Sequence, residues 1–287
     1  MYFRRPLRTL YRRCGDLYYR GLRALIPLYA AHHARRGSPG RVYRIPGRQC
    51  RMWLPISWGK TVVQRRFGMF EPWSFSVCDR VAKPGMVVVE LGACYGALTI
   101  HLSRLVGPTG RVYAFEPFPK YYSILCRNVA LNQLDNVECI NLAIAPRGVE
   151  RIDFDSAAIN PYGSLGEISG YQYPTPPVVP GAGDARRDRV PCMTLPDFMD
   201  SRNISMDLLF MDVEGCEVGV VADVEPVLRA CGARPIVYME THAQFYGFAE
   251  RDRMREVLTE SGYKIETIGG HWLCTPHAPE PTDDGPL

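Results

Sequence analysis

The segment at residues 86–91 (MVVVEL) constrains the fold most strongly, because it is apolar and lacks the alternation of a strand with one face in water. A β-branched run of this kind is typical of a parallel strand that helices cover on both faces. A turn containing two glycines follows at 92–96, and a helical segment follows at 97–106. This order predicts the first half of a β-α-β unit.

The alternation of strands and helices continues along the chain. Further strands are predicted at 111–115, 137–144, 206–212 and 235–240, and further helices at 119–132, 195–200, 217–230 and 250–261. Residues 263–268 and 271–275 are predicted to form a hairpin around two adjacent glycines. Together they predict an α/β fold: a mostly parallel, seven-stranded, doubly wound sheet with a C-terminal antiparallel hairpin, whose ligands bind beyond the carboxyl ends of the strands.

The 287 residues fit one large domain with an added arm, at about 100–200 residues per domain. We expect a basic arm and linker at 1–50, a globular domain at 51–277 and a flexible tail at 278–287. The stretch 37–50 is rich in glycine and proline and is predicted to be a linker or exposed loop. Residues 145–190 interrupt the alternation and are predicted to be a lid or a disordered loop.

The arm is predicted to be an amphipathic helix, because apolar residues recur every three or four positions. The stripe comprises Leu7, Tyr11, Cys14, Tyr18, Leu22, Leu25 and Tyr29. Residues 1–51 contain 13 arginines and one acid, so they carry a charge of +12. Such a helix packs on the body or on a second copy of the chain, lies on an anionic membrane surface, serves as an organelle-targeting sequence, or binds nucleic acid.

The body carries 21 basic and 29 acidic residues, a net charge of −8. That charge disfavours nucleic acid as a partner, because a nucleic-acid-binding domain usually presents a basic stripe. None of the ten cysteines has zinc-ligand spacing, and most lie in apolar segments. Free thiols are typical of a reducing compartment, and no apolar run approaches the ~18 residues of a membrane-spanning helix. We therefore expect a cytoplasmic protein, with peripheral membrane association as the alternative.

The turn after the first predicted strand suggests a ligand with amino or hydroxyl groups. Its glycines, Gly92 and Gly96, have G-x-x-x-G spacing, and Cys94 stands where a pyrophosphate cradle requires glycine. This spacing and the acid at Glu90 disfavour a nicotinamide dinucleotide. Glu116 ends the second predicted strand, 24 residues after Gly92. An acid at about this distance can accept hydrogen bonds from both ribose hydroxyls.

Two blocks of sequence resemble the FkbM-type family of class I S-adenosylmethionine-dependent methyltransferases. The first contains ELGACYG and AFEPFPKYYSILCRNVALN, and the second contains RVPCMTLPD and DLLFMDVEGCE. The resemblance extends over about residues 60–275. This chain departs from the family pattern at Glu90, where Asp is more usual, and at Cys94-Tyr95, where Asn-Ile is more usual.

The resemblance implies the residues that bind S-adenosylmethionine. The methionine part of the cofactor would be bordered by Gly92, Ala93, Tyr95 and Gly96. Glu90 would hold its amino group, and Glu116 its ribose. Asn141 and Ala143, at the end of the third predicted strand, would border the adenine. Glu71 stands where the family tends to have a glutamate near the cofactor.

Catalytic residues are expected at the ends of the fourth and fifth predicted strands. An aliphatic hydroxyl needs a base or a metal to become a good nucleophile. Asp212 and Glu240 are predicted to be either ligands of a hard cation such as Mg²⁺ or a base and its orienting partner. His242 is the favoured proton acceptor, since an unperturbed histidine has a pKa of about 6.5. Glu214 and Ser164, the latter in the predicted lid, are assigned to the acceptor side.

The sequence therefore predicts an S-adenosylmethionine-dependent O-methyltransferase. The expected acceptor is a hydroxyl of a glycan, a glycolipid or another small metabolite. Two alternatives stay open: an RNA or DNA methyltransferase, and a non-catalytic membrane-associated scaffold that retains the fold.

Overall fold

A computed structural model describes residues 40–45, 50–55, 72–155, 187–213, 215–230 and 234–277. The chain separates into two compact units, Met1–Phe70 and Glu71–Leu287. The predicted amphipathic helix of the arm lies outside the described residues, and the segment boundaries at 50 and 277 stay predictions. Within the described ranges, no helix has both the length and the apolar character needed to cross a bilayer.

The smaller unit contains an antiparallel strand pair, β1 (Gly40–Ile45) and β2 (Cys50–Pro55). The prediction of a loop or linker at 37–50 was therefore wrong for residues 40–45 and 50. Alternate residues of β2 are buried, namely Cys50, Met52 and Leu54. This period of two is typical of a strand. The two prolines and three glycines that suggested a loop lie at the edges of the strands: Gly37 and Pro39 precede β1, Gly40 begins it, and Pro46 and Gly47 stand between β1 and β2 in the sequence.

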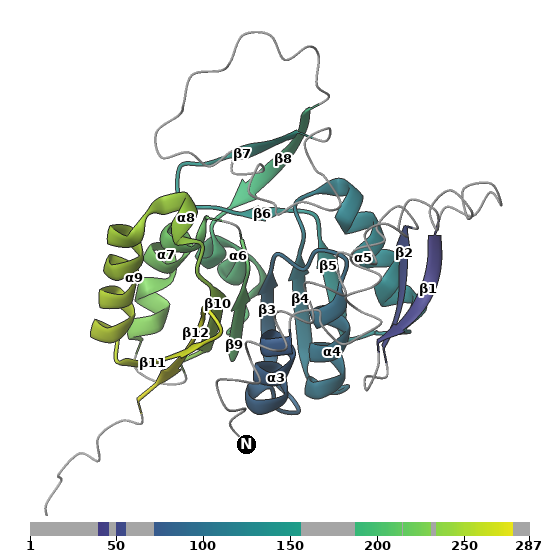
Figure 1. The fold of residues 1–287 in the computed structure, drawn as a ribbon, viewed down its shortest axis with the longest axis horizontal. Coiled ribbons are helices and arrows are strands. Elements are labelled where there is room, and N and C mark those ends of the chain that lie inside the picture. The colour runs from purple at the N-terminus through teal and green to yellow at the C-terminus, as the bar shows by residue number, and fades with distance from the viewer. Residues whose placement is uncertain are drawn as a thin grey trace, which may run out of the picture. The chain divides into compact units, whose positions relative to one another are not determined.

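The larger unit is built on a seven-stranded sheet with the order β11-β12-β10-β9-β3-β4-β5 (Figure 1). Its strands are β3 (Val87–Leu91), β4 (Arg111–Phe115), β5 (Val137–Ile140), β9 (Leu208–Met211), β10 (Ile236–Glu240), β11 (Tyr263–Ile268) and β12 (His271–Pro276). The first five strands pair in parallel, whereas β12 is antiparallel to both β10 and β11. The predicted sheet and its C-terminal hairpin are confirmed.

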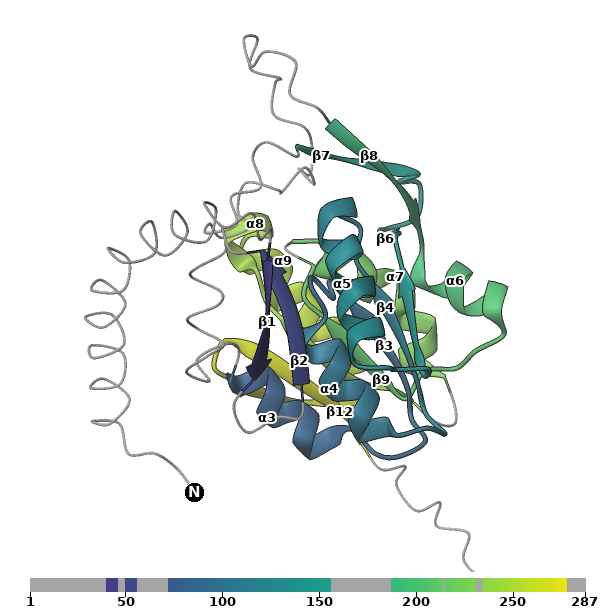
Figure 2. The same cartoon turned by 90° about the vertical axis from the view of Figure 1, so that its right-hand side faces the viewer.

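The helices form two groups (Figure 2). α4 (Ala97–Val106) contacts α3 (Pro72–Val81) and α5 (Pro119–Leu131). α7 (Glu217–Arg229) contacts α6 (Leu195–Arg202) and α9 (Phe248–Glu260) in the second group. Val89 and Leu91 of β3 belong to the same buried cluster as Phe198 of α6 and Val224 of α7. Val88, which points to the opposite face of the sheet from Val89 and Leu91, is also buried, and β3 contacts α4 of the first group. β3 is therefore covered on both sides, as its apolar sequence predicted.

The third predicted strand, 137–144, is interrupted. β5 ends at Ile140, and β6 (Ala143–Ile144) pairs instead with β8 (Arg187–Met193), which also pairs with β7 (Arg151–Asp155). The predicted loop 145–190 therefore contributes two strands, and residues 156–186 lie outside the described residues. Both views place β7 and β8 at the same end of the main sheet as α8 (Ala243–Tyr246), the short helix after β10.

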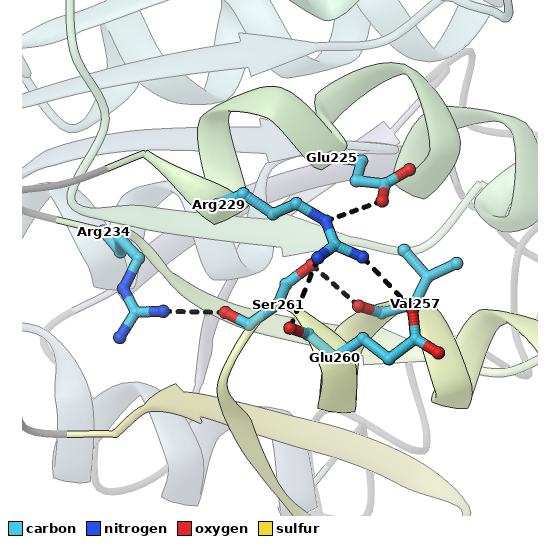
Figure 3. Close-up of polar contacts among 6 residues, drawn as sticks. All are labelled: Glu225, Arg229, Arg234, Val257, Glu260 and Ser261. Atoms are coloured by element: carbon cyan, nitrogen blue, oxygen red, sulfur yellow. Dashed lines mark hydrogen bonds and ion pairs between the residues drawn. The ribbon is translucent and has the colours of Figure 1, made fainter.

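Arginines connect the ends of α7 and α9 (Figure 3). The Arg229 guanidinium donates to the carboxylate of Glu225, at 2.7 Å, and to that of Glu260, at 3.3 Å. Arg234 donates to the carbonyl oxygen of Ser261 at 2.7 Å. The bond from Arg229 to Glu260 joins the last turns of two helices whose apolar sides share one core, and the bond from Arg234, just before β10, holds the residue that follows α9.

Candidate functional site

The turn after β3 is packed directly against the end of β9. Gly92 has a φ of +85°, and a Cβ built on it would lie 1.9 Å from the backbone oxygen of Asp212. The Asp212 N–H also donates to the carbonyl oxygen of Leu91 at 3.0 Å. Only glycine permits this backbone-to-backbone approach, so the position of the turn is fixed relative to Asp212.

Backbone and side-chain hydrogen bonds fix the shape of the turn. The N–H groups of Gly92 and Ala93 both donate to the carbonyl oxygen of Phe115, at 3.0 and 2.8 Å. The Asn128 amide of α5 donates to the carbonyl oxygen of Tyr95 at 2.8 Å. The turn that leads into α4 is therefore hydrogen-bonded to both β4 and α5.

Glu116 is a buried carboxyl group at the end of β4. It is 5% exposed, and its two oxygens accept hydrogen bonds from the N–H groups of Cys94 and Phe118, each at 2.8 Å. Burial raises the pKa of Glu116 to about 8, the two N–H bonds oppose this rise, and the nearby charge of Glu90 adds to it. Glu90 is itself 2% exposed. Two acidic residues are therefore buried on either side of the glycine turn.

The two residues predicted to border the adenine lie in different places. The Asn141 amide donates to the carbonyl oxygens of Glu116 and Pro117, both at 2.9 Å, so it belongs to the same cluster as Glu116. Ala143 is buried in β6 and pairs with Cys192 of β8, so it belongs to the second sheet. Asn141 lies in the break between β5 and β6, whereas Ala143 is the first residue after it.

A second cluster lies at the ends of β9 and β10. Asp212 follows β9, Glu240 ends β10 and His242 precedes α8. One ligand atom from each of the three residues lies within 4.8 Å of the other two. The Nε2 atom of His242 is 3.7 Å from Asp212 Oδ1 and 3.8 Å from Glu240 Oε1. The structure therefore brings together the three residues that the sequence assigned to catalysis.

Glu217 completes this cluster, although no role was predicted for it. Its Oε1 atom is 2.6 Å from His242 Nδ1, and its Oε2 atom accepts from the Gly215 N–H at 3.0 Å. Glu217 is fully buried at the first position of α7. The available signal was the second glutamate of the D-V-E-G-C-E phrase, at the start of a helix, where a buried acid is unusual.

His271 is a further residue of this region that was not predicted from the sequence. It lies opposite Glu240 in the pairing of β10 with β12, and its ring stacks on Tyr238 with centroids 5.4 Å apart. Burial lowers the pKa of His271, whereas the charge of Glu240 opposes that change. A stack of buried Tyr238 and half-buried His271 thus lies at the end of β10, where β12 pairs with Glu240.

Three predicted site residues lie outside the described residues: Glu71, Ser164 and Glu214. The described part of the site therefore consists of two neighbouring clusters. The acidic turn contains Glu90 and Glu116, and the second cluster contains Asp212, Glu240 and His242. They are linked by the contact of Gly92 with the backbone of Asp212.

Comparisons with known proteins give short or distant matches. The rRNA 2'-O-methyltransferase fibrillarin of Giardia intestinalis is 51% identical over 41 residues, which are 14% of this chain and 12% of that protein. The chain thus spans only a small part of this relative. Among solved structures, a SAM-dependent methyltransferase from Aquifex aeolicus has a TM-score of 0.38 and 16% identity, covering 73% of this chain and 91% of that one. Aeropyrum pernix fibrillarin with bound S-adenosyl-L-methionine has a TM-score of 0.40 and 15% identity, covering 68% of each chain.

A protein family matches a much larger part of the sequence. Residues 90–265 match the Methyltransferase FkbM domain, a region that includes Glu90, Glu116 and the whole second cluster. This match confirms the resemblance seen in the sequence blocks. Because it covers more than half of the chain, the protein belongs to the FkbM methyltransferase family.

Proposed function

We propose that the protein is an S-adenosylmethionine-dependent O-methyltransferase that acts on a hydroxyl of a glycan, a glycolipid or another small metabolite. The observation that carries this proposal is the burial of Glu90 and Glu116 beside the turn between β3 and α4. Buried acids repel a phosphate-bearing ligand and favour a ligand that offers hydroxyl, amino and sulfonium groups.

The cofactor would extend along the ends of β3, β4 and β5. Glu116 would accept hydrogen bonds from the ribose hydroxyls, and Glu90 would hold the amino group of the methionine part. Asn141 would border the adenine together with Glu116 and Pro117, whose carbonyl oxygens accept hydrogen bonds from its amide. The positive sulfonium would then lie close to Gly92, and therefore to the second cluster, because Gly92 contacts the backbone of Asp212.

Methyl transfer in this arrangement is an in-line displacement. The acceptor oxygen forms a bond to the methyl carbon, the carbon–sulfur bond breaks, and its electron pair stays on sulfur to give S-adenosylhomocysteine. The hydroxyl proton passes to a basic atom of the cluster of Asp212, Glu240 and His242. Most of the rate advantage comes from aligning oxygen, carbon and sulfur, which requires the two clusters to be fixed relative to each other.

Cofactor binding tests the first half of the proposal. Calorimetry of the full chain with S-adenosylhomocysteine should show one binding site, and Glu116→Gln should weaken binding by about ten-fold, which corresponds to the loss of roughly 1.4 kcal/mol from a hydrogen bond. Glu138→Gln is the matched control, because Glu138 lies in β5 and forms ion pairs with Arg111 and Arg202. Equal affinities for the two variants would contradict the assigned ribose site.

The acceptor class needs a separate measurement. Cell extract incubated with methyl-labelled S-adenosylmethionine should transfer label to glycan, glycolipid or small-metabolite fractions as an alkali-stable methyl ether. RNA is the alternative acceptor: the 41-residue match to an rRNA 2'-O-methyltransferase favours it, and the charge of −8 on residues 52–287 opposes it. Label that nuclease digestion releases as methylated nucleotides would show that this alternative is correct.

A further inference from the structure

The cluster at the ends of β9 and β10 has unusual internal spacing. The distances from His242 Nε2 to the two carboxylate oxygens, 3.7 and 3.8 Å, are too long for direct hydrogen bonds. Two atoms that bind one metal ion at about 2.1 Å can be at most about 4.2 Å apart. Both distances therefore fit atoms that share an ion. The third distance is the one between the ligand oxygens of Asp212 and Glu240, which lie within 4.8 Å of each other. These side chains are 29% and 38% exposed, so they can move closer together around an ion.

The hydrogen bond on the other side of the imidazole supports the same interpretation. A metal-binding histidine almost always donates its second ring N–H to a carboxylate or carbonyl oxygen, which fixes the tautomer that leaves the other nitrogen available. Glu217 provides this carboxylate at 2.6 Å from Nδ1. It is fully buried and is held in turn by the Gly215 N–H. The Nε2 atom is thereby directed toward the two carboxylates.

We infer that Asp212, Glu240 and His242 form a binding site for a first-row divalent cation such as Mn²⁺, with Glu217 as the residue that positions the histidine. Three carboxylates, Asp212, Glu240 and Glu217, surround one imidazole here, and a cation offsets their mutual repulsion. A set of two carboxylates and one imidazole suits Mn²⁺ or Fe²⁺, whereas Mg²⁺ prefers oxygen ligands only.

His242 then has a different role from the predicted one. The sequence favoured it as a proton acceptor, but an Nε2 atom that holds an ion cannot also accept a proton. The ion would stabilise negative charge that develops on the acceptor oxygen, and the hydroxyl proton would pass to a carboxylate oxygen of Asp212 or Glu240 that does not hold the ion. This use of the ion rests on the proposed function, whereas the presence of the site does not.

Manganese binding to the full chain tests the inference directly. After removal of metals with a chelator, titration with Mn²⁺ followed by electron paramagnetic resonance should show one ion per chain. The bound ion should show nuclear modulation from one imidazole nitrogen in an electron spin echo measurement. A wild-type chain that binds no stoichiometric Mn²⁺, or that binds it without nitrogen modulation, would overturn the inference.

Variants separate ligands from the positioning residue. His242→Ala should abolish the nitrogen modulation, and Asp212→Asn and Glu240→Gln should each weaken Mn²⁺ binding. Glu217→Gln should keep the modulation and weaken binding by roughly 10–100-fold, as expected for a residue behind a ligand. Glu266→Gln is the control, because Glu266 lies on β11 and is paired with Arg80. Its affinity for Mn²⁺ should equal that of the wild type, and equal affinity in the cluster variants would contradict the site.

Calorimetry with S-adenosylhomocysteine on the same samples distinguishes this inference from the proposed function. Normal cofactor binding without Mn²⁺ binding would refute the cation site alone. Mn²⁺ binding without cofactor binding would refute the proposed function and leave the cation site standing.

Discussion

The contact between Gly92 and Asp212 leads to a quantitative prediction for Gly92→Ala. The new methyl group would lie 1.9 Å from the Asp212 oxygen and 2.9 Å from its carbonyl carbon. Both are backbone atoms at the end of a buried strand, so the conflict cannot be relieved by rotating a side chain. Alanine would also have to adopt a φ of +85°.

The two effects give the expected cost. A left-handed backbone costs an L-residue roughly 1–2 kcal/mol. Overpacking a close contact adds about 1–3 kcal/mol. The free energy of unfolding should therefore fall by about 2–5 kcal/mol, which lowers the urea midpoint by roughly 1–2.5 M at a slope of about 2 kcal/mol/M. Affinity for S-adenosylhomocysteine should fall too, because the turn moves away from β9.

Gly148→Ala is a matched control for the backbone effect. Gly148 has a φ of +93°, and no atom lies within 4 Å of a Cβ built on it. It should show only the conformational cost of roughly 1–2 kcal/mol. Urea unfolding of the two full-length variants, followed by circular dichroism, measures the difference. If the two midpoints coincide, the close approach of the turn to Asp212 is wrong.

Three further predictions concern pH, an arginine pair and the basic arm. The folded pKa of Glu116, about 8, lies above its ordinary value of 4.5, so the folded chain binds the extra proton. The stability that this proton contributes is complete below pH 4.5 and is lost as the pH rises to about 8, by up to about 1.4 kcal/mol of unfolding free energy per pH unit. Urea unfolding at several pH values should show this decline for the wild type, and Glu116→Gln should reduce its slope. Arg234 donates to the carbonyl oxygens of Ser261 and His277 at 2.7 and 3.0 Å, so Arg234→Ala should cost about 2 kcal/mol of unfolding free energy. Arg229→Ala removes exposed ion pairs and one long, exposed hydrogen bond of 3.4 Å to the carbonyl oxygen of Glu260. It should leave the urea midpoint almost unchanged in about 0.5 M salt, where surface charges are strongly screened. Removal of residues 1–36 should leave S-adenosylhomocysteine affinity unchanged and should weaken binding to anionic liposomes or alter the oligomeric state, as sedimentation would show.

Local sequence patterns predicted most of the larger unit. The helix at 97–106 and the strand at 111–115 have the observed bounds, because a glycine turn and the segment Gly107–Gly110 delimit them. Thr194 accepts a hydrogen bond from the Asp197 N–H at 3.1 Å, and this cap starts α6 where the sequence predicted it. Local signals of this kind lie within a few residues of the structure they specify.

The remaining features depend on contacts between distant residues. The break after β5 is accompanied by bonds from the Asn141 amide to the carbonyl oxygens of Glu116 and Pro117, which no pattern around 137–144 reveals. Glu217 and His242 are 25 positions apart and meet only because α7 and β10 follow neighbouring parts of the sheet. The sequence identified His242 by its place after a strand, but not its carboxylate partner. The strand Cys50–Pro55 was not predicted, because the glycines and prolines before it indicated a loop.

The order of strands at the C-terminal edge affects how the chain can be assembled during synthesis. β12 lies between β10 and β11, although both precede it in the sequence. Until His271–Pro276 emerges from the ribosome, β10 has an open edge and β11 has no neighbour. Open edges of this kind invite pairing between nascent chains. Any shortened version of the protein that stops before His271 should therefore precipitate, even though it retains every residue of the acidic turn.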